Sequence, residues 1–419
     1  MKSKLIAGSL VGVSVFALLA GCSSQTDGGD ESTGDPCTSD TPTEITFWHT
    51  YSTDSAENDQ LTNTVLPEFA KECPGVTVDA VVMPYDGLHD QLIAGVSAGG
   101  LPDVMRMDII WTPEFADLGA LQAVDDFDGF SDITSSVLPG PLSTNEYQGA
   151  YYGLPLDTNT QAYVYNTDLI STPPTTFDEL EALGEELKDS GVSALALGGS
   201  GPWNVLPWFW SAGGTVTNDD YTKASGYLDS ADSVAALQWL VDFNSAGLLG
   251  ASSVGGTPDS WGGFSGGQYA GLSDGPWLVA TFQSDMSLGE ATIPAGPGGS
   301  ISVVGGENLV MFASSTHQQA AWAFEKFLMS DFAQEAMAEV GQIPVTQSAL
   351  ASSAVTGVSY LAPFVEQLQT AQARTPVPNW TQIDPILTDA FSAALLGDKT
   401  AEQALSDAAT QIDPLLTDD

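Results

Sequence analysis

Basic side chains are scarce in this sequence of 419 residues, which has 9 lysines and arginines against 54 aspartates and glutamates and a formal net charge of −45 at pH 7. Only Arg106 and Arg374 carry guanidinium groups. Nucleic acids, phosphate esters and anionic membrane surfaces are bound through basic contacts, and a sugar acid usually needs an arginine clamp. The composition therefore argues against these partners and leaves neutral or cationic ligands.

Histidine is also scarce, and the phosphate-binding loop of nucleotide-binding proteins is missing. His49, His89 and His317 are far apart and do not form a zinc-binding spacing. There is no Gly-x4-Gly-Lys-Ser/Thr loop, so any ATPase that drives transport must be another chain. Residues 263–267 match the nucleophile elbow G-x-S-x-G, but glycines stand where that elbow needs a strand and a helix. We therefore predict neither catalytic residues nor a cofactor nor a metal, with a secreted glycosidase or esterase as the enzyme alternative.

One apolar run is prominent, at residues 5–20, and it follows Lys2 and Lys4. This is the layout of a secretory signal, and the run is too short to remain as a membrane-spanning helix. It ends in Leu-Ala-Gly-Cys22, which resembles the lipobox of bacterial lipoproteins, in which the cysteine is diacylated and becomes the new N-terminus. We predict a signal peptide at 1–21 and a lipid-anchored flexible tether at 22–43, rich in Ser, Thr, Gly, Asp and Pro. The mature chain is then extracytoplasmic, held on the outer face of a membrane through lipidated Cys22.

The two other cysteines, Cys37 and Cys73, precede two predicted strands at 44–48 and 76–82. If these strands are parallel neighbours, their starts lie at the same edge of the sheet, within reach of a disulfide. An exported location permits that bond. We predict a Cys37–Cys73 disulfide, with two free thiols as the alternative.

From residue 44 onward, short apolar strands alternate with amphipathic helices, predicted at 55–72 with an interruption at Pro67 and at 87–98. A third strand is predicted at 103–107, which gives a βαβαβ run and hence a parallel sheet with ligands at the carboxyl ends of its strands. Thr176 with Glu179 predicts the start of a helix through 189, and Ser315 with Gln318 the start of another to about 329. The length suggests two lobes.

The segment 151–157, Tyr-Tyr-Gly-Leu-Pro-Leu-Asp, with Tyr-Val-Tyr-Asn at 163–166, resembles the crossover of carbohydrate-binding proteins of ABC importers. These are the family 1 extracellular solute-binding proteins, which include maltose-binding protein. Further blocks match in order at 45–49, 101–104, 119–121, 173–180, 210–214, 274–277, 321–329 and 341–345. The resemblance covers essentially the whole chain after the tether.

This resemblance implies a two-lobed α/β fold like that of periplasmic binding proteins, with a hinge that the chain crosses more than once and a ligand cleft between the lobes. We expect the first lobe at 44–155 plus 301–356 and the second at 156–300 plus 357–419. The implied function is capture of a neutral saccharide by lobe closure and delivery to ABC permease subunits in the membrane, without covalent chemistry. We expect a monomer. The number of candidate aromatic plates favours a di- or oligosaccharide.

A saccharide site needs aromatic plates for the flat C–H faces of the rings and carboxylates or amides for the hydroxyls. Trp277 is the first candidate, because the matching family tryptophan stacks on a sugar ring. The other predicted contacts are His49, Tyr51, Asp108, Trp111, Asp157, Trp208, Trp261, Glu307 and Trp380. Their structural alternatives stay open: Trp277 as core, Asp157 as a cap, Glu307 as a solvated hinge charge. Of the cluster of Trp203, Trp208 and Trp210 we choose Trp208 and leave Trp210 open as a core residue, while Trp239 and Trp322 are expected in the core. Asp108, Asp157 and Glu307 would also suit a cationic ligand such as a polyamine, which is the second binding hypothesis.

Overall fold

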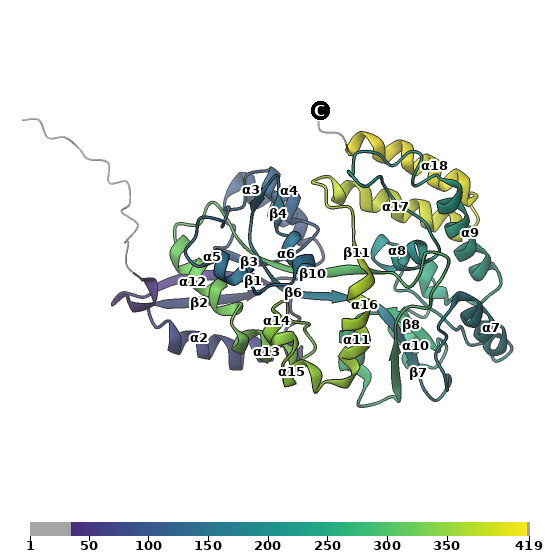
Figure 1. Ribbon diagram of the computed structural model, residues 1–419, viewed down its shortest axis with the longest axis horizontal. Coiled ribbons are helices and arrows are strands. Elements are labelled where there is room, and N and C mark those ends of the chain that lie inside the picture. The colour runs from purple at the N-terminus through teal and green to yellow at the C-terminus, as the bar shows by residue number, and fades with distance from the viewer. Residues whose placement is uncertain (1–34, 417–419) are drawn as a thin grey trace, which may run out of the picture. The chain divides into compact units, whose positions relative to one another are not determined.

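The computed structural model describes residues 35–416, so the predicted signal peptide, Cys22 and most of the predicted tether lie outside the described residues (Figure 1). The larger sheet has the order β11-β10-β3-β1-β2, with β6 also paired to β10. Its strands are β1 (Thr43–His49), β2 (Val76–Val82), β3 (Val104–Asp108), β6 (Leu154–Thr160), β10 (Ser302–Met311) and β11 (Ala371–Ala373). A second sheet, of order β8-β7-β9, comprises β7 (Ala162–Asn166), β8 (Gly271–Asp274) and β9 (Leu288–Ala291), and a small hairpin comprises β4 (Glu146–Tyr147) and β5 (Ala150–Tyr151).

Helices cover both sheets. In the first part of the chain they are α1 (Ala56–Gln60), α2 (Leu66–Glu72), α3 (Leu88–Ala98), α4 (Thr112–Asp117), α5 (Phe130–Thr134) and α6 (Pro139–Ser143). The middle holds α7 (Phe177–Lys188), α8 (Pro202–Ser211), α9 (Ala231–Ser245), α10 (Ser260–Ser265) and α11 (Pro276–Phe282). The last part holds α12 (Gln318–Leu328), α13 (Asp331–Ala338), α14 (Gln347–Leu350), α15 (Ser353–Thr356), α16 (Ala362–Gln367), α17 (Trp380–Leu395) and α18 (Ala401–Ile412). None of the helices between residues 35 and 416 is long and apolar enough to span a bilayer.

The predicted βαβαβ unit is confirmed. β1 pairs in parallel with both β2 and β3, and Thr43 lies opposite Val76, so the two strands start at the same edge. The Cys37–Cys73 disulfide joins the segment before β1 to the segment before β2, as predicted. Gly75 permits this approach, because a Cβ there would lie 2.1 Å from the carbonyl oxygen of Pro36.

The structure differs from the predicted helix ends in three details. The predicted interruption near Pro67 is a widened turn at Leu61–Val65, where the amide of Leu66 bonds to the carbonyl of Leu61, five residues back. Thr176 caps α7, but the carboxylate of Glu179 accepts from Thr175, so only half of the predicted capping box forms. The predicted cap at Ser315 is wrong: α12 begins after His317, and the Ser315 oxygen accepts from the amide of His317, before the helix, while its hydroxyl donates to Asp103.

Alternating strand residues form two buried clusters on the larger sheet. Ile45 and Phe47 of β1 belong to the cluster that α12 and α13 cover, whereas Met105 and Met107 of β3 belong to the opposite cluster with α3 and α4. A third cluster packs α7, α8, α9, α17 and α18 together, and a fourth packs β7 and β8 against α11 and α16. Antiparallel β6 and β10 lie side by side (Figure 1), and β10 also contacts α8.

One carboxylate is buried in this core without a partner. Glu325 of α12 is fully buried, and neither of its carboxylate oxygens has a hydrogen-bond partner among the described residues. Burial raises the pKa of Glu325 well above its usual range. The folded chain therefore keeps a proton that the unfolded chain releases above a pH of about 4.3. The free energy of unfolding falls as the pH rises from there through the raised folded-state pKa.

We expect Glu325→Gln to make the protein more stable than the parent at pH 8, by about 1–3 kcal/mol, because the amide cannot ionise in the core. The gain should vanish near pH 4, where the unfolded carboxyl group is also protonated. Urea unfolding at both pH values measures it, with the exposed Glu186→Gln of α7 as the matched control. An equal effect of Glu325→Gln at the two pH values would contradict the expectation.

Candidate functional site

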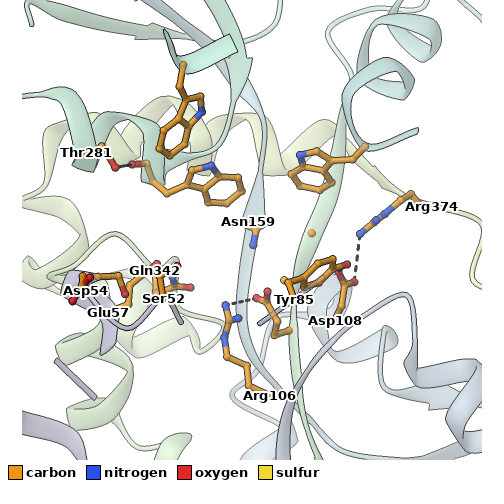
Figure 2. A pocket seen from close by; sticks show the side chains of 17 residues that line it. Ser52, Asp54, Glu57, Tyr85, Arg106, Asp108, Asn159, Thr281, Gln342 and Arg374 are labelled. Carbon is orange, nitrogen blue, oxygen red and sulfur yellow. Dashed lines mark hydrogen bonds and ion pairs between the residues drawn. The ribbon is translucent and has the colours of Figure 1, made fainter. Parts of the chain in front are cut away.

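A pocket of about 810 Å³ opens where the two sheets and their helices meet (Figure 2). Its walls come from segments far apart in the chain: the loop after β1, the end of β3, the middle of β10, helices α8, α10 and α11, and the residue after β11. The lining residues are Ser52, Asp54, Ser55, Glu57, Tyr85, Arg106, Asp108, Asn159, Trp203, Trp261, Trp277, Thr281, Gly305, Gly306, Glu307, Gln342 and Arg374.

Three indole rings form one wall of this pocket. Trp203 lies in the first turn of α8, Trp261 in α10 and Trp277 in α11, and the rings of Trp203 and Trp277 stack at 6.3 Å between centroids. Asp274 at the end of β8 accepts from Nε1 of Trp261 at 2.7 Å and from Nε1 of Trp277 at 2.8 Å. A single half-buried carboxylate therefore fixes the orientation of two indole rings.

Small residues make room for these rings. A Cβ at Gly275 would lie 2.3 Å from the ring of Trp277, and one at Gly305 would lie 2.7 Å from the ring of Trp203. Any side chain at either position would push an indole out of place, because a fused aromatic ring cannot bend away. The glycines of the Asp274-Gly275-Pro276-Trp277 and Gly305-Gly306-Glu307 motifs are thus part of the wall.

Three carboxylates lie in a row across adjacent strands, and two of them, Asp108 and Glu307, line the pocket. Glu307 of β10 is the register partner of Asp157 on β6 and of Asp108 on β3. Like charges placed directly opposite in a sheet repel one another. Burial raises the pKa of Glu307 well above its usual range, and Asp157 adds to the rise, while Arg106 opposes it.

The positive charge of Arg106, on β3, compensates the negative charges of this row. Its Nη2 lies 2.6 Å from Oε2 of Glu307 and 3.3 Å from Oδ2 of Asp157, and its Nη1 donates to Thr50. The guanidinium also lies 4.3 Å from the ring centroid of Tyr51. Burial by itself would lower the pKa of Arg106, but Glu307 and Asp157 outweigh burial and raise it. Arg106 therefore stays charged at the wall of the pocket.

The two ends of the pocket differ in character (Figure 2). At one end, Glu57 accepts from Nε2 of Gln342, next to Asp54. Burial raises the pKa of Glu57, against the opposing effects of Arg106 and Gln342. At the other end, Tyr85 donates to Asp108 at 2.9 Å, and Arg374 faces the same carboxylate. Each end offers hydrogen-bonding groups, and the indoles from α8, α10 and α11 line the same pocket.

Four of the ten predicted contacts line the pocket: Asp108, Trp261, Trp277 and Glu307. Three more stand directly behind lining residues. Tyr51 and Asp157 contact Arg106, and the ring of Trp111 stacks on that of Tyr85 at 5.2 Å. These three side chains are buried and hold the lining residues in place.

The other three predicted contacts are not at the pocket surface. His49 is buried beside Tyr51, and burial, with Arg106, lowers its pKa to about 4. Trp208 is fully buried, with its ring stacked on that of Phe177, because it points from α8 into the helical core. Trp380 is likewise buried in that core, at the start of α17, and does not cover the cleft. Of the clustered tryptophans, Trp203 and not Trp208 reaches the pocket.

Sequence reasoning missed Arg106, Arg374, Tyr85, Glu57 and Gln342 as lining residues. The sequence does mark Arg106 as a candidate site residue, because it is a charged side chain in the middle of the otherwise apolar stretch Val104-Met105-Arg106-Met107. The other four lie in loops or at helix ends, where no periodicity marks them.

The G-x-S-x-G match does not have the context of a nucleophile elbow. Ser265 is the last residue of the short helix α10, and its hydroxyl donates to the carbonyl oxygens of Trp261 and Gly262 in that helix. A nucleophile elbow places its serine on a turn between a strand and a helix. The geometry at Ser265 therefore gives no support to the esterase alternative.

A mixed α/β chain with a pocket lined by indoles and carboxylates, between strands of its larger sheet and helices α8, α10 and α11, is a binding-protein architecture. The chain belongs to the family of bacterial extracellular solute-binding proteins, whose family model matches residues 64–359. The resemblance found in the sequence is thereby confirmed.

Relatives and solved structures agree with this assignment. The chain is 26% identical over 318 residues to the maltotriose-binding protein of Pyrococcus abyssi, covering 73% of this chain and 67% of the relative. The GacH receptor of Streptomyces glaucescens, solved unliganded and with acarbose and an acarbose homologue, is 25% identical with a TM-score of 0.81, covering 90% of this chain and 98% of the receptor. The cyclic α-maltosyl-1,6-maltose binding protein of Arthrobacter globiformis is 26% identical with a TM-score of 0.76, covering 90% and 99%. The fold is the two-lobed fold of maltose-binding-like proteins.

Proposed function

We propose that this protein captures a neutral di- or oligosaccharide outside the cell and presents it to the permease of an ABC importer. The observation that carries the proposal is the wall of three indoles, Trp203, Trp261 and Trp277, facing a row of carboxylates and amides in one pocket. Indole faces suit the C–H faces of pyranose rings, and carboxylate and amide groups suit their hydroxyls. Three indole rings in one pocket favour a ligand of more than one sugar ring.

The ligands of the relatives support this class. Maltotriose and a cyclic maltosyl-maltose occur in the names of two of the proteins described above, and the GacH receptor was solved in complex with acarbose. We infer a ligand of the same kind, a gluco-oligosaccharide, for this chain.

The mechanism we propose is closure of two lobes around the ligand, with lobes at 44–155 plus 301–356 and 156–300 plus 357–419. In support, one buried cluster gathers side chains of β1, β3, β10 and α12, and another gathers those of α7, α8, α9, α17 and α18. Val355 shares a cluster with Val164 and Leu272 of β7 and β8, which favours a return crossing slightly before residue 357. A ligand that contacts both walls binds the closed state better and so shifts the population toward it.

We further propose that the mature protein works as a monomer anchored to the outer face of the membrane through lipidated Cys22. The support is the signal-like N-terminal sequence and the extracellular description of the family. The permease and its ATPase are separate chains in this scheme.

A thermal-shift screen of the mature chain tests the function. We expect maltotriose or acarbose to raise the unfolding midpoint by mass action, and glucose, D-glucuronate and spermidine to leave it unchanged. A shift with spermidine alone would replace the saccharide proposal by the polyamine one. Turnover of a chromogenic glycoside would instead favour an enzyme.

Trp277→Ala is expected to weaken binding of the saccharide that raises the unfolding midpoint in this screen. The expected loss of affinity is about 30- to 100-fold, since a buried aromatic anchor contributes about 2–3 kcal/mol. Isothermal titration calorimetry measures the change in Kd. Phe332→Ala, which truncates an exposed aromatic ring outside the pocket, is the control and should bind as the parent does. Equal affinities of the Trp277→Ala variant and the parent would place the ligand elsewhere.

A further inference from the structure

One side-chain hydrogen bond joins the two proposed lobes outside the pocket. Thr381, in the first turn of α17, donates through its hydroxyl to Oε2 of Glu114 in α4, at 3.0 Å. Neither residue is among those that line the pocket. The two residues are 267 positions apart in the sequence, so this bond exists only because the lobes meet at this place.

The two helices that carry this bond belong to different buried clusters. Phe115 of α4 packs with Met105 of β3 in the cluster that also holds side chains of α3. Trp380 and Ile383 of α17 pack in the cluster of α7, α8, α9 and α18, and Figure 1 shows α17 beside α18. Each end of the bond is therefore fixed to the close-packed core of its own lobe. A rotation of one lobe against the other must break or form the bond.

Glu114 is also held in place from within its own lobe. Nε2 of His89, in α3, lies 2.8 Å from the same Oε2 of Glu114. The ring of His89 packs on the rings of Trp111 and Phe115, at 5.5 and 5.8 Å between centroids. The side chains of His89 and Glu114 are 25% and 20% exposed, so water screens their charges only in part. One carboxylate oxygen thus has a polar partner from each lobe.

The start of α17 suits an acidic partner. Its first turn holds no acidic residue, and Asn379, which precedes the helix, makes no side-chain cap bond. The amino end of a helix carries a partial positive charge, which a nearby carboxylate stabilises. Glu114 supplies that carboxylate from the other lobe, so the hydrogen bond to Thr381 and the dipole of α17 act in the same direction.

We propose that Glu114 and Thr381 are positioning residues that clasp the two lobes and set the lifetime of the bound saccharide without contacting it. The clasp, meaning the Glu114–Thr381 hydrogen bond, stabilises the arrangement in which the lobes meet at this place. Its free energy shifts the population of the protein toward that arrangement, and a ligand held between the lobes leaves more slowly. The inference rests on the proposed capture of a saccharide by lobe closure and names two residues that control it.

The rate of ligand release tests the clasp. Stopped-flow tryptophan fluorescence with maltotriose and with acarbose compares the parent with Thr381→Val, which keeps the shape of the side chain and removes its donor. We expect the dissociation rate constant to rise about 5- to 10-fold, because a hydrogen bond to a charged group is lost, and the association rate constant to stay within about twofold. Equal release by Thr381→Val and the parent would overturn the proposal.

Two further variants separate the clasp from a general loss of packing. Thr381→Ser keeps the hydroxyl and should release the ligand as the parent does. Thr410→Val makes the matched change on α18 of the same lobe, where the hydroxyl donates to the carbonyl of Ser406 within its own helix, and should also behave as the parent. Release from Thr381→Ser as fast as from Thr381→Val would overturn the role of the hydroxyl.

A double-mutant cycle assigns the effect to this pair of residues. Thr381→Val should speed release in the parent but not in the Glu114→Ala background, where the acceptor is already gone. The same increase in both backgrounds would mean that Thr381 acts through another partner, and it would overturn the pair.

Small-angle X-ray scattering decides the clasp without a ligand. We expect a larger radius of gyration for Glu114→Ala and for Thr381→Val than for the parent and Thr410→Val, because the lobes lose a bond that holds them together. Equal radii would overturn the clasp. A parent that binds no saccharide would instead overturn the proposed function, while the scattering of these four proteins still decides whether Glu114 and Thr381 hold the lobes.

Discussion

Replacing Arg106 with methionine is expected to lower the free energy of unfolding by about 3–5 kcal/mol at pH 7, because it leaves a buried carboxylate pair without its counter-charge. Arg106 is 6% exposed and lies within 3.3 Å of oxygens on both Glu307 and Asp157. Methionine fills similar space without charge. Urea unfolding of the two proteins measures the difference.

The loss should depend on pH. Burial already raises the pKa of Glu307, and removal of Arg106, which opposes that rise, lets the pKa increase further. The folded variant then holds a proton that its unfolded chain releases, so its unfolding free energy falls as the pH rises. We therefore expect a smaller loss at pH 5 than at pH 8.

A triple variant separates charge from packing. Arg106→Met combined with Asp157→Asn and Glu307→Gln removes the whole charged group, and we expect most of the lost stability to return. If the triple variant is as unstable as Arg106→Met alone, the loss comes from packing rather than from uncompensated charge. A single variant as stable as the parent would show that the pair does not need Arg106.

Removal of the Cys37–Cys73 disulfide is the second large effect. The bond closes a loop with a sequence separation of 36, and the chain-entropy account gives a stabilisation of about 3–4 kcal/mol for such a loop. We expect the Cys37→Ser/Cys73→Ser variant to lose this amount in urea unfolding.

Reduction of the parent protein is the matched control for that variant, since it opens the same loop without substituting a side chain. Both treatments should lower stability equally, and reductant should leave the double variant unchanged. In the folded state the amide of Gly75 still donates to the carbonyl of Cys37, so the segment keeps one tie to the sheet. A loss below about 1 kcal/mol would mean that the unfolded chain gains little freedom when the loop opens.

Much of the fold was predictable because it depends on local signals. The apolar runs of β1, β2 and β3, separated by helices, predict parallel pairing, and that pairing brings Cys37 and Cys73 together. Thr176 fixes the start of α7 through its own side chain. Ser315 is not the cap of α12, because its oxygen accepts from the amide of His317, which precedes the helix, and its hydroxyl donates to the distant Asp103.

The site was predictable only in part. Asp274, Gly275 and Trp277 are close in sequence, so one motif gives both the plate and the carboxylate that orients it. Trp203 and Trp208 are only five residues apart on α8, yet one lines the pocket and the other is core. Composition cannot tell these faces apart, because both carry large apolar rings.

The sequence by itself determined the class of this protein, its parallel first sheet, its disulfide and the residue types suited to a saccharide, because each follows from local periodicity, capping or a contiguous motif. Only the tertiary structure decided which side chains meet. The register of β3, β10 and β6 places Asp108, Glu307 and Asp157 in one row, and Arg106 and Arg374, 268 positions apart in the sequence (374 − 106), converge on that row. Such long-range pairing depends on packing energy summed over the whole core, which no single segment of the sequence encodes.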